Sequence, residues 1–442
     1  LFDFCQNSTF KRRIESCVNC SKIKIVDMAE YLCFYNFVHI SLSQHTALLY
    51  NTINGAHMTV SNLLLVEKLR LLEECSDLSF YGIRIDADIA EVIDFQELTK
   101  FVLESISGNI LSLDSEHMPI HIVPSLKVLN EQVPGAINRK VVQEKIFTEN
   151  NRQKSYVHYN ENVFQISFFI NASCNDKWEG YPEAYRQYMF PEIGKNTELS
   201  FELIKTIVEC NFPNLSQVNL IIGNVGDDSI VNINNLIKML KVKTNLVVYI
   251  LIDEFKKIAL SEDKSVDITY VVWTNSYDNL CKLGDYSEFK QLFFQFLICD
   301  DRELKELESY SDSQNCFICF YYTGNNKEFC VENLSFSIDD LFNRRHEEKQ
   351  LLANSALDSN HFGHLVILSN GEVYSNVNKP SIGRLPYDNV YDLLIREFSQ
   401  YRHWFVTRKD IKPCSDCLFS VLCSSITDVE YCLNTYNLCD VK

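Results

Sequence analysis

The chain has 442 residues, of which 46% are hydrophobic and 23% charged, and its formal net charge is −18. This composition excludes a disordered or fibrous chain, and the length predicts about three domains. Such an acidic surface repels nucleic-acid phosphates and anionic lipids. We therefore expect neither nucleic acid nor a membrane as partner.

The N-terminal segment resembles no targeting signal. Residues 1–17 carry charges where a signal peptide needs a long apolar region, which predicts a cytoplasmic protein. The chain has no apolar run of about 18 residues, so we expect no transmembrane helix. Periodic structure strengthens at Met28, and we treat residues 1–30 as a leader whose place in the fold is uncertain.

Residues 31–112 are predicted to form a small module of strands followed by helices. Strands are expected at 33–41, 46–52 and 56–60, with a turn at Asn54-Gly55 between the last two. A helix should follow Ser61 and Asn62, and another should begin at Asp94. This order is typical of a winged-helix-like module.

Residues 113–359 contain an alternation of strands and helices. Helices are expected at 199–210 and 233–240, and such crossovers favour a parallel sheet in an α/β fold. Only about 180 residues carry the pattern, too few for a full eight-stranded barrel, so we predict a curved, incomplete barrel. The six strands are expected at 163–170, 218–222, 246–251, 267–273, 293–298 and 316–322.

Residues 360–442 form a cysteine-rich tail, which begins with a hairpin around Gly371 and a helix near 391–398. Cys414 and Cys417 have the spacing with which two thiolates bind one metal centre from a turn, and Cys423 can complete it. Either Cys439 or Cys432 would supply the fourth ligand. The pattern is compatible with an iron–sulfur cluster, with structural zinc, or with buried thiols that bind no metal.

Other cysteines and histidines give weaker signals. The chain has 17 cysteines, an odd number that cannot all form disulfides within one chain. Cys316 and Cys319 should point to opposite faces of one strand and so not chelate together. The pair Cys17 and Cys20 lies in the leader, where metal binding is not favoured. Nucleophile and triad patterns are missing from the sequence, and three histidines are interpreted as structural: His57, His121 and His361.

The tail resembles the SPASM domain that follows the catalytic barrel in radical SAM peptide maturases. The similarity lies in Cys414-Ser-Asp-Cys417 and Cys423, in Gly363–Tyr374 and in Pro380–Arg384. It implies one [4Fe-4S] cluster on Cys414, Cys417, Cys423 and Cys439. The family's second auxiliary cluster is not expected, because Asn376 and Thr427 stand where cysteines would be.

The predicted barrel departs from that family at its first strand. Radical SAM enzymes carry a CxxxCxxC motif there, and its three thiolates hold the cluster that binds S-adenosylmethionine (SAM). Cys174 fits the first position, but Trp178 and Tyr181 occupy the other two, and neither is a usual iron–sulfur ligand. The glycine-rich SAM contact is reduced to Gly223-Asn-Val225, so SAM is not expected as a cofactor.

With its cluster motif lost, the chain is similar to pseudo-radical-SAM proteins of Bacteroides-type double-glycine peptide natural-product systems. This resemblance implies a non-catalytic partner that binds a ribosomally made precursor peptide, the active radical SAM maturase, or both. It also implies that residues 31–112 are a peptide-recognition element. Two alternatives remain: an enzyme that uses the remaining cluster or uncleaved SAM, and a zinc-stabilised structural protein.

Overall fold

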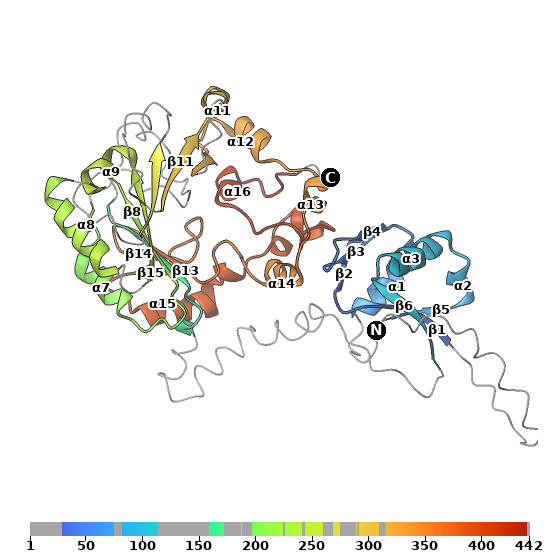
Figure 1. Cartoon of the computed structure of the whole chain (residues 1–442). Helices are drawn as coiled ribbons and strands as arrows, with labels where there is room; N and C mark the ends of the chain where they lie inside the picture. The colour runs from blue at the N-terminus through green and yellow to red at the C-terminus, as the bar shows by residue number, and fades with distance from the viewer. Residues whose placement is uncertain are drawn as a thin grey trace, which may run out of the picture.

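The structure is a computed structural model of the whole chain. It describes residues 29–74, 82–113, 159–171, 187, 197–223, 226–240, 244–259, 268–274, 289, 291–308 and 315–439. Figure 1 shows the N-terminal segment in blue, a large sheet with helices in green and yellow, and the C-terminal segment in orange and red between them.

The N-terminal module, residues 29–113, contains an antiparallel sheet packed on two helices. The sheet has the order β2-β3-β4, formed by Val38–Leu42, Ala47–Asn51 and His57–Val60. Helices α1 (Leu63–Glu74) and α3 (Ile93–Glu104) share a hydrophobic core with one face of it. Because strand side chains alternate, Ala47 and Leu49 face this core while Leu48 and Tyr50 face the other way.

The predicted strand 33–41 is wrong, because the chain turns between residues 34 and 38 and enters a second sheet. β1 (Ala29–Phe34) pairs with β5 (Gly82–Ile85) and β6 (Gly108–Leu113), neither of which was predicted. A short helix, α2 (Ala87–Ala90), follows β5. The strands and helices expected after residue 46 are present, although Leu63 and Leu64 of α1 are exposed.

The predicted parallel sheet is confirmed. Six parallel strands lie side by side in chain order within a sheet of nine. Its central strands are buried on both faces, which explains their continuous hydrophobic runs. The six are β7 (Gln165–Phe169), β8 (Gln217–Ile222), β9 (Asn245–Leu251), β10 (Thr269–Thr274), β11 (Leu292–Ile298) and β12 (Cys316–Phe320).

Helices α7, α8 and α9 cover one face of this sheet (Figure 1). They span Phe201–Val208, Asp227–Leu240 and Ile252–Ala259, and α11 (Asp301–Glu308) follows β11. The chain is therefore of the mixed α/β class, and the partial barrel stays a prediction. None of the described helices is long and apolar enough to span a membrane.

The tail contributes strands to the large sheet. β13 (His364–Ile367) pairs in parallel with β7, and β14 (Glu372–Tyr374) and β15 (Gly383–Arg384) continue the sheet beyond it. The predicted hairpin is present between β13 and β14, where Gly371 has a φ of +84°. Val366, Tyr374 and Val377 pack on the sheet face opposite α7 to α9.

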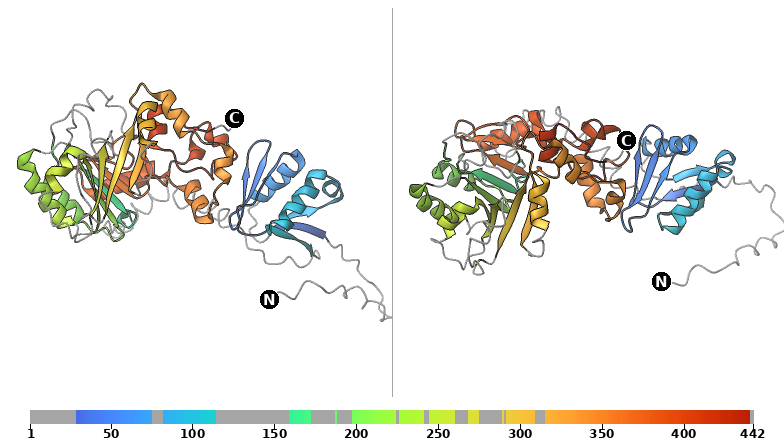
Figure 2. Two further views of the ribbon diagram at one scale, coloured as in Figure 1. Left: turned by 45° about the horizontal axis from the view of Figure 1, so that its top comes forward. Right: turned by 90° about the horizontal axis from the view of Figure 1, so that it is seen from above.

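The remaining C-terminal helices are α12 (Lys327–Leu334), α13 (Ile338–Phe342), α14 (Glu348–Ala356), α15 (Val390–Arg396) and α16 (Asp428–Leu433). Helices α13, α14 and α16 lie between the large sheet and the N-terminal module, whereas α15 packs in the core of the large sheet together with α7 (Figure 1 and Figure 2). The helix predicted near 391–398 is present as α15, followed by a π-helical turn at Glu397–Tyr401.

Candidate metal centre

The four cysteines predicted as ligands lie within electrostatic range of one another, and their role as ligands stays a prediction. The thiols of Cys414, Cys417 and Cys423 interact electrostatically with one another and with that of Cys439. Cys439 reaches this place because its backbone bridges to Phe336, which precedes α13. We call Cys414, Cys417, Cys423 and Cys439 the four-thiol site.

Cys432, the alternative fourth ligand, lies elsewhere. It sits on α16 in a hydrophobic cluster with Cys330, and its sulfur contacts the Asn378 side chain at 3.7 Å. Burial, together with the nearby Asp428 carboxylate, raises the pKa of the Cys432 thiol to about 12. The geometry therefore favours Cys439 over Cys432 as the fourth member of the set.

Short turns position the thiols of the four-thiol site. Cys414 begins a 3-10 turn, Cys414–Asp416, and the chain turns back so that the Cys423 amide donates to the Phe419 carbonyl (3.3 Å). The Phe419 amide donates to the Cys417 sulfur, an interaction that favours the thiolate. Metal-bound thiolates are stabilised by such backbone donors.

A buried cation lies beside the thiols. Arg408 Nη1 donates to the Cys414 sulfur (3.6 Å), and Arg408 Nη2 forms an ion pair with Glu430 (2.9 Å). Burial opposes the charge of Arg408, but Glu430 and the thiols of Cys414 and Cys423 raise its pKa above the usual value. The guanidinium would offset negative charge on Cys414 and Cys423 if these thiols lost their protons.

The residue types of the four-thiol site suit zinc or an iron–sulfur cluster, but their arrangement in the structure does not. Burial raises the pKa of Cys423 to about 12 and also raises the pKa values of Cys414 and Cys417. Within the described ranges, no group of three or more His, Cys, Asp or Glu side chains is arranged to hold a metal ion.

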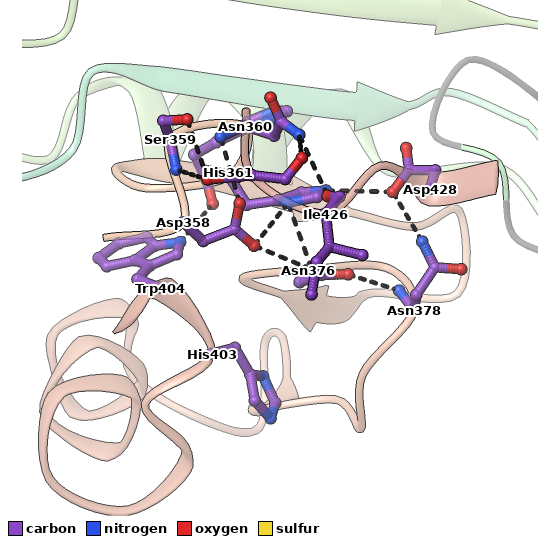
Figure 3. A network of polar contacts seen from close by, with 12 residues as sticks. Asp358, Ser359, Asn360, His361, Asn376, Asn378, His403, Trp404, Ile426 and Asp428 are labelled. Atoms are coloured by element: carbon purple, nitrogen blue, oxygen red, sulfur yellow. Dashed lines mark hydrogen bonds and ion pairs between the residues drawn. The ribbon is translucent and has the colours of Figure 1, made fainter. Parts of the chain in front are cut away.

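A second polar cluster, the imidazole network, is centred on His361 (Figure 3). His361 Nδ1 contacts Asp358 (2.9 Å) and its Nε2 contacts Asp428 at the start of α16 (3.1 Å). Asn378 donates to Asp428 (2.7 Å), and Asn376 donates to Asp358 (3.4 Å). The network ties the residues before β13 and after β14 to α16.

The charge of His361 follows from its two carboxylate partners. Burial alone would lower its pKa, but the hydrogen bonds and charges of Asp358 and Asp428 raise the pKa to about 10. The imidazole is therefore protonated at neutral pH and links the two carboxylates. This agrees with the structural role predicted for His361.

The structure also shows what replaces the cysteines that the resemblance marks as lost. Asn376 is fully buried and belongs to the imidazole network. Thr427 caps α16, where its hydroxyl accepts from the Glu430 amide (3.3 Å). Asn376 thus serves a buried hydrogen-bond network, and Thr427 serves as a helix cap.

The structure describes only some of the other cysteines, histidines and motif residues that the sequence analysis named. Cys316 and Cys319 belong to different hydrophobic clusters, as alternation along β12 predicts. His57 is exposed and stacks on Phe342, with ring centroids 3.6 Å apart. Several residues singled out in the sequence lie outside the described ranges: Cys17, Cys20, His121, Cys174, Trp178, Tyr181 and 224–225.

No protein-family model and no curated protein matches this chain. BtrN in complex with AdoMet and 2-DOIA is similar over 55% of this chain and 85% of its own, at 12% identity and a TM-score of 0.26. Native anSMEcpe with bound AdoMet is similar over 59% of this chain and 88% of its own, at 13% identity. Its TM-scores are 0.35 with the Cp18Cys peptide and 0.36 with the Kp18Cys peptide, and values this low do not establish a shared fold.

Proposed function

We propose that this protein is a non-catalytic partner in the maturation of a ribosomally made peptide, and that it binds the precursor as an added strand on β4. The open edge of β4 is the observation that carries the proposal. β4 pairs with β3 on one side, and within the described ranges no strand pairs with its other side. Such an edge offers main-chain donors and acceptors to an extended peptide.

The register identifies the outward-facing amides. The Asn51 amide donates to the Ala56 carbonyl (2.8 Å), so hydrogen bonding to β3 recurs at Met58 and Val60. The amides of His57 and Thr59 therefore point to the open edge. Since α3 packs next to β4, its exposed side chains would contact the bound peptide and contribute selectivity.

The proposal that the protein is non-catalytic depends on the missing cysteines of the radical SAM cluster motif. Trp178 and Tyr181 stand where a radical SAM enzyme needs thiolates, which leaves Cys174 alone. A bound metal in the four-thiol site would supply a rigid cross-link of the C-terminal segment, or electron transfer if it is a [4Fe-4S] cluster. The maturase is the second proposed partner, and a cytoplasmic location is part of the same proposal.

Replacing Thr59 with Pro is expected to weaken peptide binding about tenfold. Proline removes one outward amide, and its ring obstructs an added strand, while the hydrogen bonds between β3 and β4 remain. The loss of one hydrogen bond alone contributes about 1 kcal/mol. The measurement is a calorimetric titration of the full-length protein with precursor peptides encoded near its gene.

Thr59→Val is the matched control, because it keeps the amide and should bind like the wild type. Equal affinity of Thr59→Pro and wild type would exclude β4 as the binding edge. If cognate and scrambled peptides bind the wild type equally, selective recognition of the precursor is excluded and docking to the maturase remains as the partner hypothesis.

A further inference from the structure

One face of the edge strand β4 is turned toward the C-terminal segment. Tyr50 of β3 pairs with His57, and Leu48 pairs with Thr59. Directly paired residues of neighbouring strands point to the same face of a sheet. Leu48 and Tyr50 share a hydrophobic cluster with Leu351 of α14, so this face packs on the C-terminal segment. The side chains of His57 and Thr59 therefore point toward that segment and away from the core of the module.

The end of α13 and the residues after it lie along this face of β4. The ring of Phe342 stacks on that of His57, with centroids 3.6 Å apart and planes inclined by 12°. Arg345 Nη1 donates to the Ile53 carbonyl (2.9 Å). The Cγ of Arg345 lies 3.8 Å from the position that a Cβ on Gly55 would take. The C-terminal segment therefore lines the turn before β4 and the first residue of the strand.

Neighbouring rings hold Phe342 in place beside β4. Its ring centroid lies 6.4 Å from that of Tyr50 and 5.8 Å from that of Phe419. The His346 amide, four residues further on, donates to the Tyr50 hydroxyl (2.8 Å) and fixes the chain after α13 to β3. Phe342 is nevertheless only half-buried, and His57 is exposed. The stacked pair thus has accessible surface on which a further side chain can pack.

A peptide that is added beside β4 would continue the same sheet and meet this stacked pair. Neighbouring strands lie about 4.8 Å apart, and successive side chains of a strand point to opposite faces. The peptide residue that pairs with His57 would point to the same face as His57, where Phe342 lies. The peptide residues before and after it would point to the face that α1 and α3 cover. One bound strand would therefore contact two separate parts of the chain.

We propose that the C-terminal segment is the second wall of the peptide site, and that Phe342 and His57 together bind one large apolar or aromatic side chain of the peptide. The inference rests on the proposed function, and it adds the chemical class of the peptide residue that pairs with His57. An extended peptide is the occupant, because the outward amides of β4 and the stacked rings adjoin each other. Main-chain hydrogen bonds accept most sequences, so the ring contact supplies sequence preference.

The experiment is a double-mutant cycle between the full-length protein and the precursor peptide encoded near its gene, measured by calorimetric titration. Phe342→Ala should weaken binding of the unchanged peptide about tenfold. Each large apolar residue of the peptide is then replaced with Ala in turn. At one position this replacement should cost about tenfold in wild type but less than about twofold in Phe342→Ala, because the contact is already lost. A variant that merely disturbed the module would weaken all peptides by one factor, and such uniform behaviour would overturn the proposal.

Two further variants complete the design. Phe342→Leu keeps an apolar side chain and serves the same cycle if Phe342→Ala does not fold. Leu71→Ala is the matched control, since Leu71 is 55% exposed on α1, which packs next to β2, and it should bind peptide like wild type. If Thr59→Pro weakens binding but no peptide position couples to Phe342, the second wall is overturned and the proposed function stands. Equal binding of cognate and scrambled peptides, or equal affinity of Thr59→Pro and wild type, would overturn the peptide site on β4 and this inference with it.

Discussion

Cys417→Ala is expected to abolish metal loading of the four-thiol site. The Cys417 thiolate is central to the set, because it accepts the Phe419 amide and interacts with the thiols of Cys414 and Cys439. Three remaining thiols cannot complete a closed four-ligand site. After anaerobic reconstitution with iron and sulfide, the broad charge-transfer absorption of the wild type should be missing from the variant.

Two further variants separate the possible ligand sets. Cys439→Ala should lose the metal, and Cys432→Ala should keep it, because Cys432 packs with Cys330 away from the other thiols. Iron, sulfide and zinc analysis of the anaerobically purified wild type distinguishes a cluster from structural zinc. If Cys174→Ala removes the iron while Cys417→Ala does not, the assignment of the site is wrong.

His361→Leu is expected to destabilise the protein by about 3–5 kcal/mol, because it leaves Asp358 and Asp428 without their shared cation. The wild-type contribution has a defined pH dependence. Since folding raises the pKa of His361 to about 10, the stabilisation is complete below the unfolded value near 6.5 and is lost as pH rises through about 10. The stability difference between wild type and variant should therefore narrow with increasing pH in urea unfolding.

His403→Leu provides the comparison, because this second buried histidine is uncharged. Burial, together with the nearby charge of Lys379, lowers the pKa of His403 to about 4. The difference in the free energy of unfolding between His403→Leu and wild type should stay constant between pH 7 and pH 10. A His361→Leu effect that is independent of pH would show that the imidazole is not protonated in the folded state.

Local patterns were sufficient to predict most of the large sheet. The run Leu246–Leu251 is apolar without alternation, as expected of a strand buried on both faces. The pairing of β13 with β7 could not be predicted, because a hairpin signal at Gly371 is local and the partner strand lies about 200 residues earlier. The break between β1 and β2 was missed because Tyr35-Asn36-Phe37 contains no glycine or proline.

Only part of the candidate site could be predicted, because sequence patterns detect residues that are close together in the chain. Spacing alone identified Cys414, Cys417 and Cys423, which lie within ten residues of one another. The choice between Cys439 and Cys432 needed the fold, because α16 carries Cys432 toward Cys330. The imidazole network had no usable sequence signal, since His361 and Asp428 are 67 residues apart.

The most direct test of the proposed non-catalytic function is a SAM cleavage assay on the full-length protein. The protein is reconstituted anaerobically with iron and sulfide, then incubated with dithionite and SAM. The proposal predicts no 5′-deoxyadenosine above the enzyme-free control, because Trp178 and Tyr181 cannot hold the cluster that reductive cleavage requires. Turnover above that control, lost in Cys174→Ala, would contradict it and establish the chain as an enzyme.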